Sequence, residues 1–350
     1  MKPAIRHLLS QSILPLLLLL ALLLLPAAGL KPNVIRLLFI TYVWTITSIA
    51  WNLVGGFTGQ VSFGFAVFYG LGAYTTGLFI NAGGSPYLGF IEAAGIAALA
   101  SFLIGLPTFR LRGPYFAIAT IGITEAVRVI MSNLQITGGA SGLSIIEHRQ
   151  FRQVEHYYSA LVAVALAVVV SILIARSRFG LALRAIKQDE DAAAALGVNP
   201  YQSKLWVHAI AAALTGIAGA LHARYHVFID PSGGPGGVFA FQTGISILLM
   251  PVIGGIGTVW GPVLGGMVFG IVEEELVVNF PNFHLLLYGI LLILIVLLEP
   301  DGLVGLLRKI PRLMRRSKSD IALLEPEHGL VGSLRKILES MWSSNGDSKS

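Results

Sequence analysis

Long apolar runs, separated by short polar loops, follow one another from the N-terminus to about residue 300. A helix needs about 20 mostly apolar residues to cross the hydrocarbon layer of a bilayer. Ten segments approach or exceed this length, which predicts an all-α integral membrane protein with about ten transmembrane helices, some of them broken or rich in glycine. The predicted spans lie near residues 10–28, 34–53, 56–80, 91–108, 115–133, 158–175, 204–224, 238–256, 260–279 and 284–298.

The first apolar segment allows two interpretations. Lys2 and Arg6 precede an apolar core at Leu16–Leu25, and Pro26-Ala27-Ala28 resembles a cleavage site, as in a secretory signal peptide. The segment is long for a signal peptide, however, and another span follows within about ten residues. We therefore favour a retained membrane helix in residues 1–33.

Charged residues are scarce and unevenly distributed. The 350 residues include 42 Lys, Arg, Asp and Glu, or 12%, about half the share of a soluble domain. Residues 301–350 hold 15 of them, and Glu92 is the only charge between Leu37 and Phe109. So few charges could not cover the surface of a soluble domain of this size, which excludes a soluble enzyme, a nucleic-acid-binding protein and a disordered chain. Cysteine is absent, which excludes disulfides and thiolate metal sites.

Basic residues cluster in two places, and Lys and Arg are enriched in the cytoplasmic loops of membrane proteins. We therefore expect the loop at 177–204 and the tail at 308–350 to be cytoplasmic. An even number of spans then places the N-terminus on the same side. The basic residues are Arg176, Arg178, Arg184, Lys187 and Lys204 in the loop, and Arg308, Lys309, Arg312, Arg315, Arg316 and Lys318 after the last span.

The stretch Asn52–Tyr74 combines six glycines with polar side chains at membrane depth. Small residues allow helices to approach closely, and tight packing is one interpretation. Irregular backbone is tolerated in a bilayer where protein or a water-filled cavity satisfies it, so a broken helix that lines a solute path is the other. On that second interpretation Asn52, Gly59, Gln60 and Ser62 are candidate path residues.

Glu125 and Arg128 bring two charges into the fifth predicted span. Residues at i and i+3 share a helix face, and an unpaired charge at membrane depth costs several kcal/mol. We therefore expect the two side chains to form a pair, which either clamps the structure or lines the translocation path.

The loop at 177–204 is rich in alanine and charge, and Leu183, Ile186 and Leu196 form an apolar stripe on it. A solvated connector does not need such a stripe, so we favour a helix that docks on a partner. Gly197 is a candidate C-cap for this helix.

Pro251–Gly270 contains two prolines and seven glycines, which favours a tight turn near Gly257–Gly261 between two spans. Glu273, Glu274 and Glu275 follow it, and we expect them at the membrane interface.

No pattern in the sequence forms an active site. The phosphate-binding Gly-x-x-x-x-Gly-Lys-[Ser/Thr] and the Gly-x-Ser-x-Gly nucleophile motif are absent. His222 and His226 are four residues apart without a clear third metal ligand. We expect neither catalysis nor a bound metal or cofactor.

Four blocks of sequence, in order, resemble the LivM/LivH family, the permease subunits of ABC importers for branched-chain amino acids. The resemblance covers about residues 34–307, and LivM-type members fit best because of the apolar first span and the second block. The blocks read NLVGGFTGQVSFGFAVFYGLGAY, LRGPYFAIATIGITEAVRVI, SRFGLALRAIKQDEDAAAALGVN and LLMPVIGGIGTVWGPVLGG.

The resemblance implies a permease domain at 34–307 in a bacterial cytoplasmic membrane; the distribution of basic residues, as above, predicts that both termini are cytoplasmic. It implies alternating access with a sister permease subunit, two ATPase subunits that carry ATP and Mg, and an external solute-binding protein. The third block resembles the coupling loop that docks on the ATPase, where Asp191 replaces the usual Glu. The implied contact residues are Arg184, Asp191, Ala192, Ala193 and Gly197.

The solute remains open at this stage. The charge-free wall at 37–91 suits an apolar amino acid, but urea and short-chain amides, which other members of the family import, would tolerate it equally. An ion-coupled secondary transporter is a further alternative, although it gives the loop at 177–204 no role.

The tail at 308–350 also allows two interpretations. Its basic start is attracted to anionic lipid, and Val331, Leu334, Leu338 and Met341 share one face of a short helix. Such a helix needs a membrane or a partner surface, because it is too short to be stable alone in water. A frayed tail is the alternative.

Overall fold

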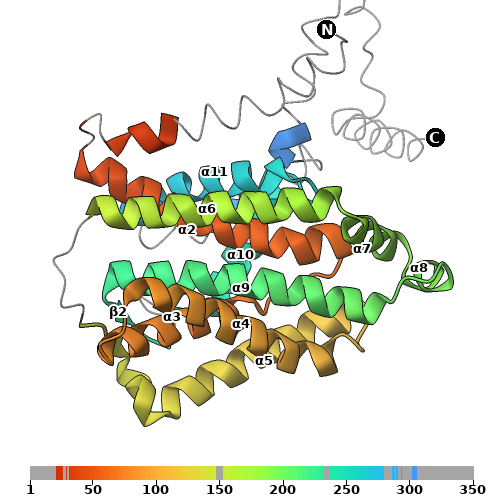
Figure 1. Cartoon of the computed structure of the whole chain (residues 1–350), viewed down its shortest axis with the longest axis horizontal. Coiled ribbons are helices and arrows are strands. Elements are labelled where there is room, and N and C mark those ends of the chain that lie inside the picture. Colours follow the sequence, from red (N-terminus) through yellow and green to blue (C-terminus); the bar gives the residue numbers. More distant parts are fainter. Residues whose placement is uncertain are drawn as a thin grey trace, which may run out of the picture. The chain divides into compact units, whose positions relative to one another are not determined.

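The computed structural model describes residues 21–26, 29, 31–146, 153–231, 237–279, 286–287, 289–290, 293 and 302–305. The chain divides into two compact units after Gly305, and the second unit, residues 306–350, lies outside the described residues. Long helices form nearly all of the first unit (Figure 1). They are α2 (Pro32–Trp51), α3 (Phe65–Asn81), α4 (Pro86–Thr108), α5 (Pro114–Asn133), α6 (Gln153–Arg176), α9 (Pro200–His226), α10 (Phe241–Gly254) and α11 (Trp260–Asn279).

Shorter elements connect these helices. A π-helical turn, η2 (Asn52–Gly56), continues α2, and two short helices, α7 (Arg178–Gln188) and α8 (Glu190–Ala195), lie between α6 and α9 at one end of the unit (Figure 1). The 3-10 turns η3 (Gln135–Thr137) and η4 (Gly139–Ser141) follow α5. Strands β1 (Leu143–Ser144) and β2 (Phe228–Ile229) pair in antiparallel fashion near the opposite end.

Proline marks where four of the long helices begin. Pro32, Pro86, Pro114 and Pro200 each occupy the first helical turn, where the missing N–H costs no hydrogen bond and the fixed φ already suits a helix. Residues local to each start therefore favour the beginning of α2, α4, α5 and α9.

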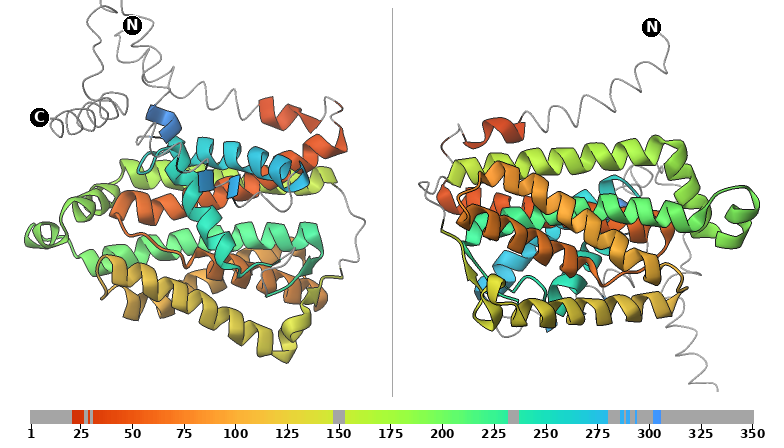
Figure 2. Two further views of the ribbon diagram at one scale, coloured as in Figure 1. Left: turned by 180° about the vertical axis from the view of Figure 1, so that it is seen from behind. Right: turned by 60° about the horizontal axis from the view of Figure 1, so that its bottom comes forward.

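Glycine allows the central helices to touch through their backbones. A Cβ on Gly72 would lie 2.1 Å from the carbonyl oxygen of Gly216, and one on Gly219 would lie 1.9 Å from that of Tyr69. These contacts join α3 to α9, and Figure 2 shows the two helices with α4 packed alongside. Tight packing, one of the two interpretations of the glycine-rich stretch, is therefore present in α3.

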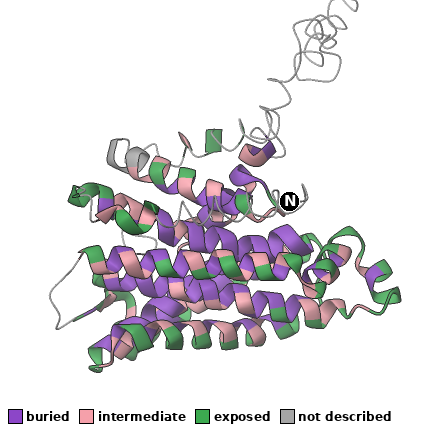
Figure 3. Ribbon diagram, turned by 45° about the horizontal axis from the view of Figure 1, so that its top comes forward, coloured by how far each residue is buried: buried purple, intermediate pink, exposed green. Residues whose placement is uncertain are grey.

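The outward faces of α4, α5 and α6 are apolar and exposed, whereas α2 and α9 are mostly buried (Figure 3). Leu99, Leu103, Ile118, Val162 and Leu173 are each more than half exposed. An exposed apolar surface of this extent suits lipid or a second membrane protein.

Among the described residues, five helices are long and apolar enough to cross a membrane: Pro32–Gly56, Pro86–Thr108, Pro114–Asn133, Gln153–Arg176 and Pro200–His226. Each coincides with a predicted span. The span predicted at 56–80 is wrong at its start, because the chain leaves the helix after η2 and α3 begins only at Phe65. Most of the first and last predicted spans lie outside the described residues, so the count of ten stays a prediction.

Candidate functional site

The stretch Asn52–Tyr74 contains a break between two helices. The π-helical turn η2 widens the end of α2, and Gly59, with a φ of 76°, turns the chain out of the helix. Residues 59–64 then lead to α3. The broken helix, one of the two interpretations of this stretch, is therefore present beside the tight packing, although the sequence gave no sign of the π-helical turn; its role in lining a solute path stays a prediction. We call residues 52–64 the broken segment.

Side chains satisfy the backbone of the broken segment where helical bonds are missing. The indole of Trp51 donates to the carbonyl oxygen of Ser62 at 2.8 Å, and the N–H of Phe63 donates to Oγ1 of Thr120 in α5 at 3.1 Å. Ser62 is buried, Gly59 is exposed, and Oε1 of Gln60 is buried with no hydrogen-bond partner among the described residues. The segment is thus anchored at its α3 end while Gly59 reaches a surface.

Asn52 joins the broken segment to the turn between α10 and α11. Its Nδ2 donates to the carbonyl oxygen of Thr258 at 2.8 Å, and its Oδ1 accepts from the N–H of Gly257 at 2.8 Å. The side-chain amide therefore pairs with the turn as a backbone peptide would. The turn itself, between Gly254 and Trp260, lies where the sequence predicted it.

Helix α7 packs into the unit instead of presenting an apolar stripe to a partner. Ser177 caps its start by accepting from the N–H of Gly180 at 3.1 Å. Leu183 and Ile186 are buried, whereas Leu196 is 84% exposed. The argument for docking from a stripe of three residues is wrong for the first two, because they face their own chain.

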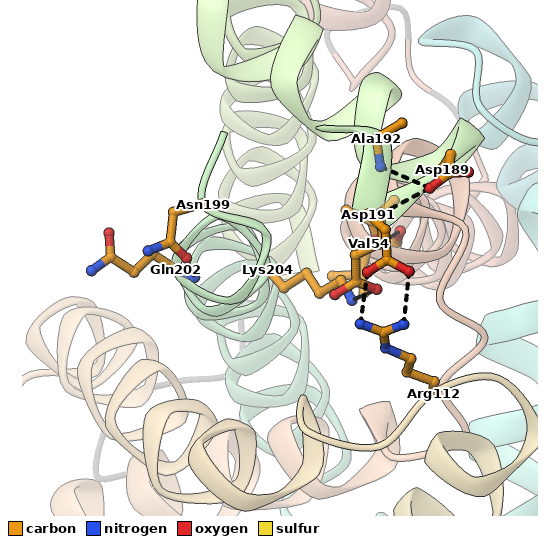
Figure 4. Close-up of polar contacts among 10 residues, drawn as sticks. Val54, Arg112, Asp189, Asp191, Ala192, Asn199, Gln202 and Lys204 are labelled. Atoms are coloured by element: carbon orange, nitrogen blue, oxygen red, sulfur yellow. Dashed lines mark hydrogen bonds and ion pairs between the residues drawn. The ribbon is translucent and has the colours of Figure 1, made fainter. Parts of the chain in front are cut away.

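Helix α8 has a defined start and end. Asp189 caps the start, with its Oδ1 accepting from the N–H groups of Asp191 and Ala192 at 2.9 Å each (Figure 4). Gly197 adopts a φ of 88° just after the helix, the left-handed conformation of a C-cap glycine, as predicted. Ala193 is buried, and Ala192 is exposed.

Two basic side chains of α7 reach the broken segment. Nζ of Lys187 donates to the carbonyl oxygen of Gly56 at 2.9 Å. The guanidinium of Arg184 lies 5.7 Å from the centre of the Phe57 ring, within the range of a cation–π contact. Sequence reasoning used Lys187 only to orient the loop, because a lysine among basic residues carries no sign of a backbone partner 131 positions away.

Two ion pairs hold α8 to other elements, and Figure 4 shows the one between Arg112 and Asp191. Arg112, in the loop between α4 and α5, donates to both carboxylate oxygens of Asp191 at 2.9 and 3.1 Å, and this carboxylate raises the pKa of Arg112. Nζ of Lys204, at the start of α9, donates to Glu190 at 2.6 Å. Lys204 is buried, so removal of Glu190 would leave it without its ion-pair partner in the interior.

The structure brings Glu125 and Arg128 together on the outward face of α5. Nε of Arg128 donates to Oε2 of Glu125 at 2.9 Å, and the two side chains are 31% and 57% exposed respectively. Ile118, Gly122 and Val129 are exposed on the same helix. The pair therefore does not clamp α5 to another described helix.

The acidic residues near the end of α11 have different surroundings. Glu274 forms an ion pair with Arg36 of α2, whereas Oε2 of Glu273 is buried and has no hydrogen-bond partner among the described residues. The expected interfacial position thus suits Glu274 better than Glu273. Within the described residues, no group of three His, Asp or Glu side chains is placed to hold a metal ion.

Comparisons with known proteins place the chain in a family. Residues 33–296 match the family described as branched-chain amino acid transport system / permease component. The high-affinity branched-chain amino acid transport permease LivM of Escherichia coli is 31% identical over 300 residues, which are 77% of this chain and 69% of the relative. LivM of Salmonella typhimurium is 31% identical over 308 residues, 79% and 71% of the two chains.

The corresponding permease LivH of Escherichia coli is 25% identical over 286 residues, 75% of this chain and 91% of the relative. No solved structure matches the chain. With three quarters of its length covered by the family and LivM proteins as similar relatives, the chain is a multi-pass membrane protein that belongs to the branched-chain amino acid transport permeases and is of LivM type.

Proposed function

We propose that this chain is a membrane-spanning subunit of an ABC importer that translocates branched-chain or other apolar amino acids by alternating access, driven by partner ATPases. The observation that carries the proposal is the α7–α8 element. It is a capped helical pair outside the long helices, and its side chains reach the broken segment. The alternative of an ion-coupled secondary transporter gives the α7–α8 element no role.

The α7–α8 element is the proposed ATPase contact. Its exposed surface includes Leu181 and Leu196, which have no apolar cover within the described chain. Arg184, Asp191, Ala192 and Gly197 lie on this surface, and the buried Ala193 packs beneath it. Asp191 also holds Arg112 and so acts in part within its own chain. Docking here would move α7 and α8 as one body.

The proposed solute path follows the exposed face of α5 and the broken segment. Glu125 and Arg128 lie in a helix with the length and composition of a membrane span, yet they point outward. Charges so placed avoid lipid and face protein or water. A sister permease that covers this face would enclose the pair, with Asn52, Gly59, Gln60 and Ser62 near the cytoplasmic end of the same path.

The remaining parts of the importer belong to other subunits. ATP and Mg bind to two ATPase subunits, this chain binds no cofactor or nucleic acid, and an extracytoplasmic binding protein delivers the solute. The complex lies in the bacterial cytoplasmic membrane, in contact with lipid, with both termini of this chain in the cytoplasm.

Reconstitution tests the proposal. The chain, a sister permease and two ATPase subunits are placed in proteoliposomes with ATP inside and leucine-loaded binding protein outside. We expect leucine uptake that requires ATP hydrolysis and every subunit. Uptake that persists without the ATPase subunits would contradict the proposal, and uptake of urea or acetamide in preference to leucine would contradict its solute.

Labelling tests the orientation. The chain has no cysteine, so Ser348→Cys introduces a single thiol in the tail. We expect an impermeant thiol reagent to label it only after the cells are opened. Labelling in intact cells would contradict both the cytoplasmic tail and the even number of spans.

A further inference from the structure

We infer that Lys187 is the positioning residue through which movement of α7–α8 reaches the broken segment and the α10–α11 turn together. The inference rests on the proposed function of α7–α8 as the ATPase contact. It goes beyond docking, because it names the atom that links the docked element to the part of the membrane domain that departs from regular helix.

The ammonium of Lys187 lies where three segments meet. It donates to the carbonyl oxygen of Gly56 at 2.9 Å, and a Cβ on Gly257 would lie 3.3 Å from it. Asn52 ties the same two segments to each other through its hydrogen bonds to Gly257 and Thr258. One side chain of α7 therefore contacts a pair of segments that are already joined.

The chemistry of a helix end explains why a lysine suits this place. The last carbonyls of a helix have no N–H ahead of them, and the end carries a partial negative charge that favours a cation. Gly56 closes the π-helical turn, so the ammonium of Lys187 supplies from another element the donor that the chain cannot supply itself. Withdrawal of α7 would leave this carbonyl without that donor.

Side chains one helical turn apart on α7 point to the same target. Arg184 and Lys187 are related by i and i+3, and Arg184 contacts the ring of Phe57, directly after η2. By contrast, the ion pairs of Glu190 and Asp191 lead to the start of α9 and to the loop before α5. Among the described residues, the polar contacts of α7–α8 with the broken segment are those of Arg184 and Lys187.

Gly56 allows the broken segment to lie directly against the α10–α11 turn. A Cβ on Gly56 would lie 2.0 Å from Oδ1 of Asn52 and 2.8 Å from the nitrogen of Gly257, so no larger residue fits between the broken segment and the turn. A displacement of Gly56 through its carbonyl would therefore push directly on the turn.

The first test replaces the ammonium in the reconstituted complex. Lys187→Met keeps the length of the side chain and removes its donors. We expect normal assembly and normal ATP hydrolysis in response to loaded binding protein, but uptake per ATP lowered about tenfold, the equivalent of one charge-assisted hydrogen bond. Lys187→Arg, which retains donors, should recover much of the coupling.

The matched control is Arg110→Met, which removes an exposed basic residue from the neighbouring loop and should leave uptake per ATP unchanged. Full coupling in Lys187→Met would overturn the inference while the wild-type result upholds the proposed function. ATP-independent uptake by the wild-type complex would instead overturn the proposed function. An equal loss of ATP hydrolysis and uptake in Lys187→Met would assign Lys187 a merely structural role and also overturn the inference.

A cysteine pair tests the contact itself. A Cβ on Gly59 would lie 3.9 Å from Cβ of Lys187, close to the usual spacing of about 3.8 Å in disulfides. Gly59→Cys with Lys187→Cys should cross-link in the nucleotide-free complex, block uptake, and regain the uptake of the uncross-linked double variant on reduction. A non-hydrolysable ATP analogue should change the cross-linking rate. An identical rate in both states, or a cross-link that leaves uptake intact, would overturn the inference, with each single cysteine variant as the control.

Discussion

One ion pair lies within α5, and another joins the loop before α5 to α8. The two pairs differ in what determines their formation. Glu125 and Arg128 are three residues apart on one helix, so their pairing depends on helix geometry alone. Arg112 and Asp191 are 79 positions apart and join the loop between α4 and α5 to α8. The first pair neutralises charge within a helix that is long and apolar enough to span a membrane, whereas the second helps to fix the position of α8 against the loop before α5.

Removal of one partner of the membrane pair should have the largest effect. We expect Glu125→Ala or Arg128→Ala each to lower uptake by about tenfold or more, because a lone charge remains at membrane depth. The double replacement should do less harm than either single one. The measurements are uptake and the amount of chain recovered in the membrane. Additive losses in this double-mutant cycle would show that the two charges act independently.

Charge reversal of the Arg112–Asp191 pair should have an intermediate effect. Arg112→Asp or Asp191→Arg should lower uptake per ATP by a few fold, because an exposed pair contributes little to stability but orients α8. The double reversal restores attraction and should recover coupling if the pair acts within the chain. If the single Asp191→Arg loss persists in the double variant, Asp191 acts on the ATPase itself.

Two glycines should show the smallest effects, with opposite signs. Gly197→Ala forces a side chain into a left-handed φ of 88° and should lower stability by about 1 kcal/mol. Gly122→Ala, on the exposed face of α5 with open space around it, should raise the stability of the isolated chain by about 0.5–1 kcal/mol. Thermal unfolding in detergent measures both. Loss of the Gly122→Ala gain in the complete complex would indicate a close partner on this face.

Local features of the fold were predictable from the sequence. Four helix starts at proline, the C-cap at Gly197 and the turn before Trp260 each depend on a few neighbouring residues. The length of apolar runs likewise located five spans. The start of α3 was not predictable, because the break is short and contains Val61 and Phe63 beside its polar residues, and hydropathy averaged over a span does not distinguish helix from irregular backbone.

The candidate site was less predictable from the sequence than the fold, because it depends on contacts between segments that are distant along the chain. The pairing of Glu125 with Arg128 follows from spacing, whereas the partners of Lys187 and Asp191 depend on the packing of four segments. The apolar stripe misled for a related reason: Leu183 and Ile186 are buried, and periodicity alone cannot say whether the covering surface belongs to the same chain or to another.

The π-helical turn at Asn52–Gly56 holds one residue more than an α-helical turn would need. Return of that residue to α-helical geometry would rotate everything beyond it by about 100° and shift it by about 1.5 Å along the axis. Such a change is discrete, because a peptide unit is bonded either in one ladder or in the other. The end of α2 can thus adopt two discrete registers, one turn position apart, and the carbonyl that Lys187 binds lies at the point where they differ.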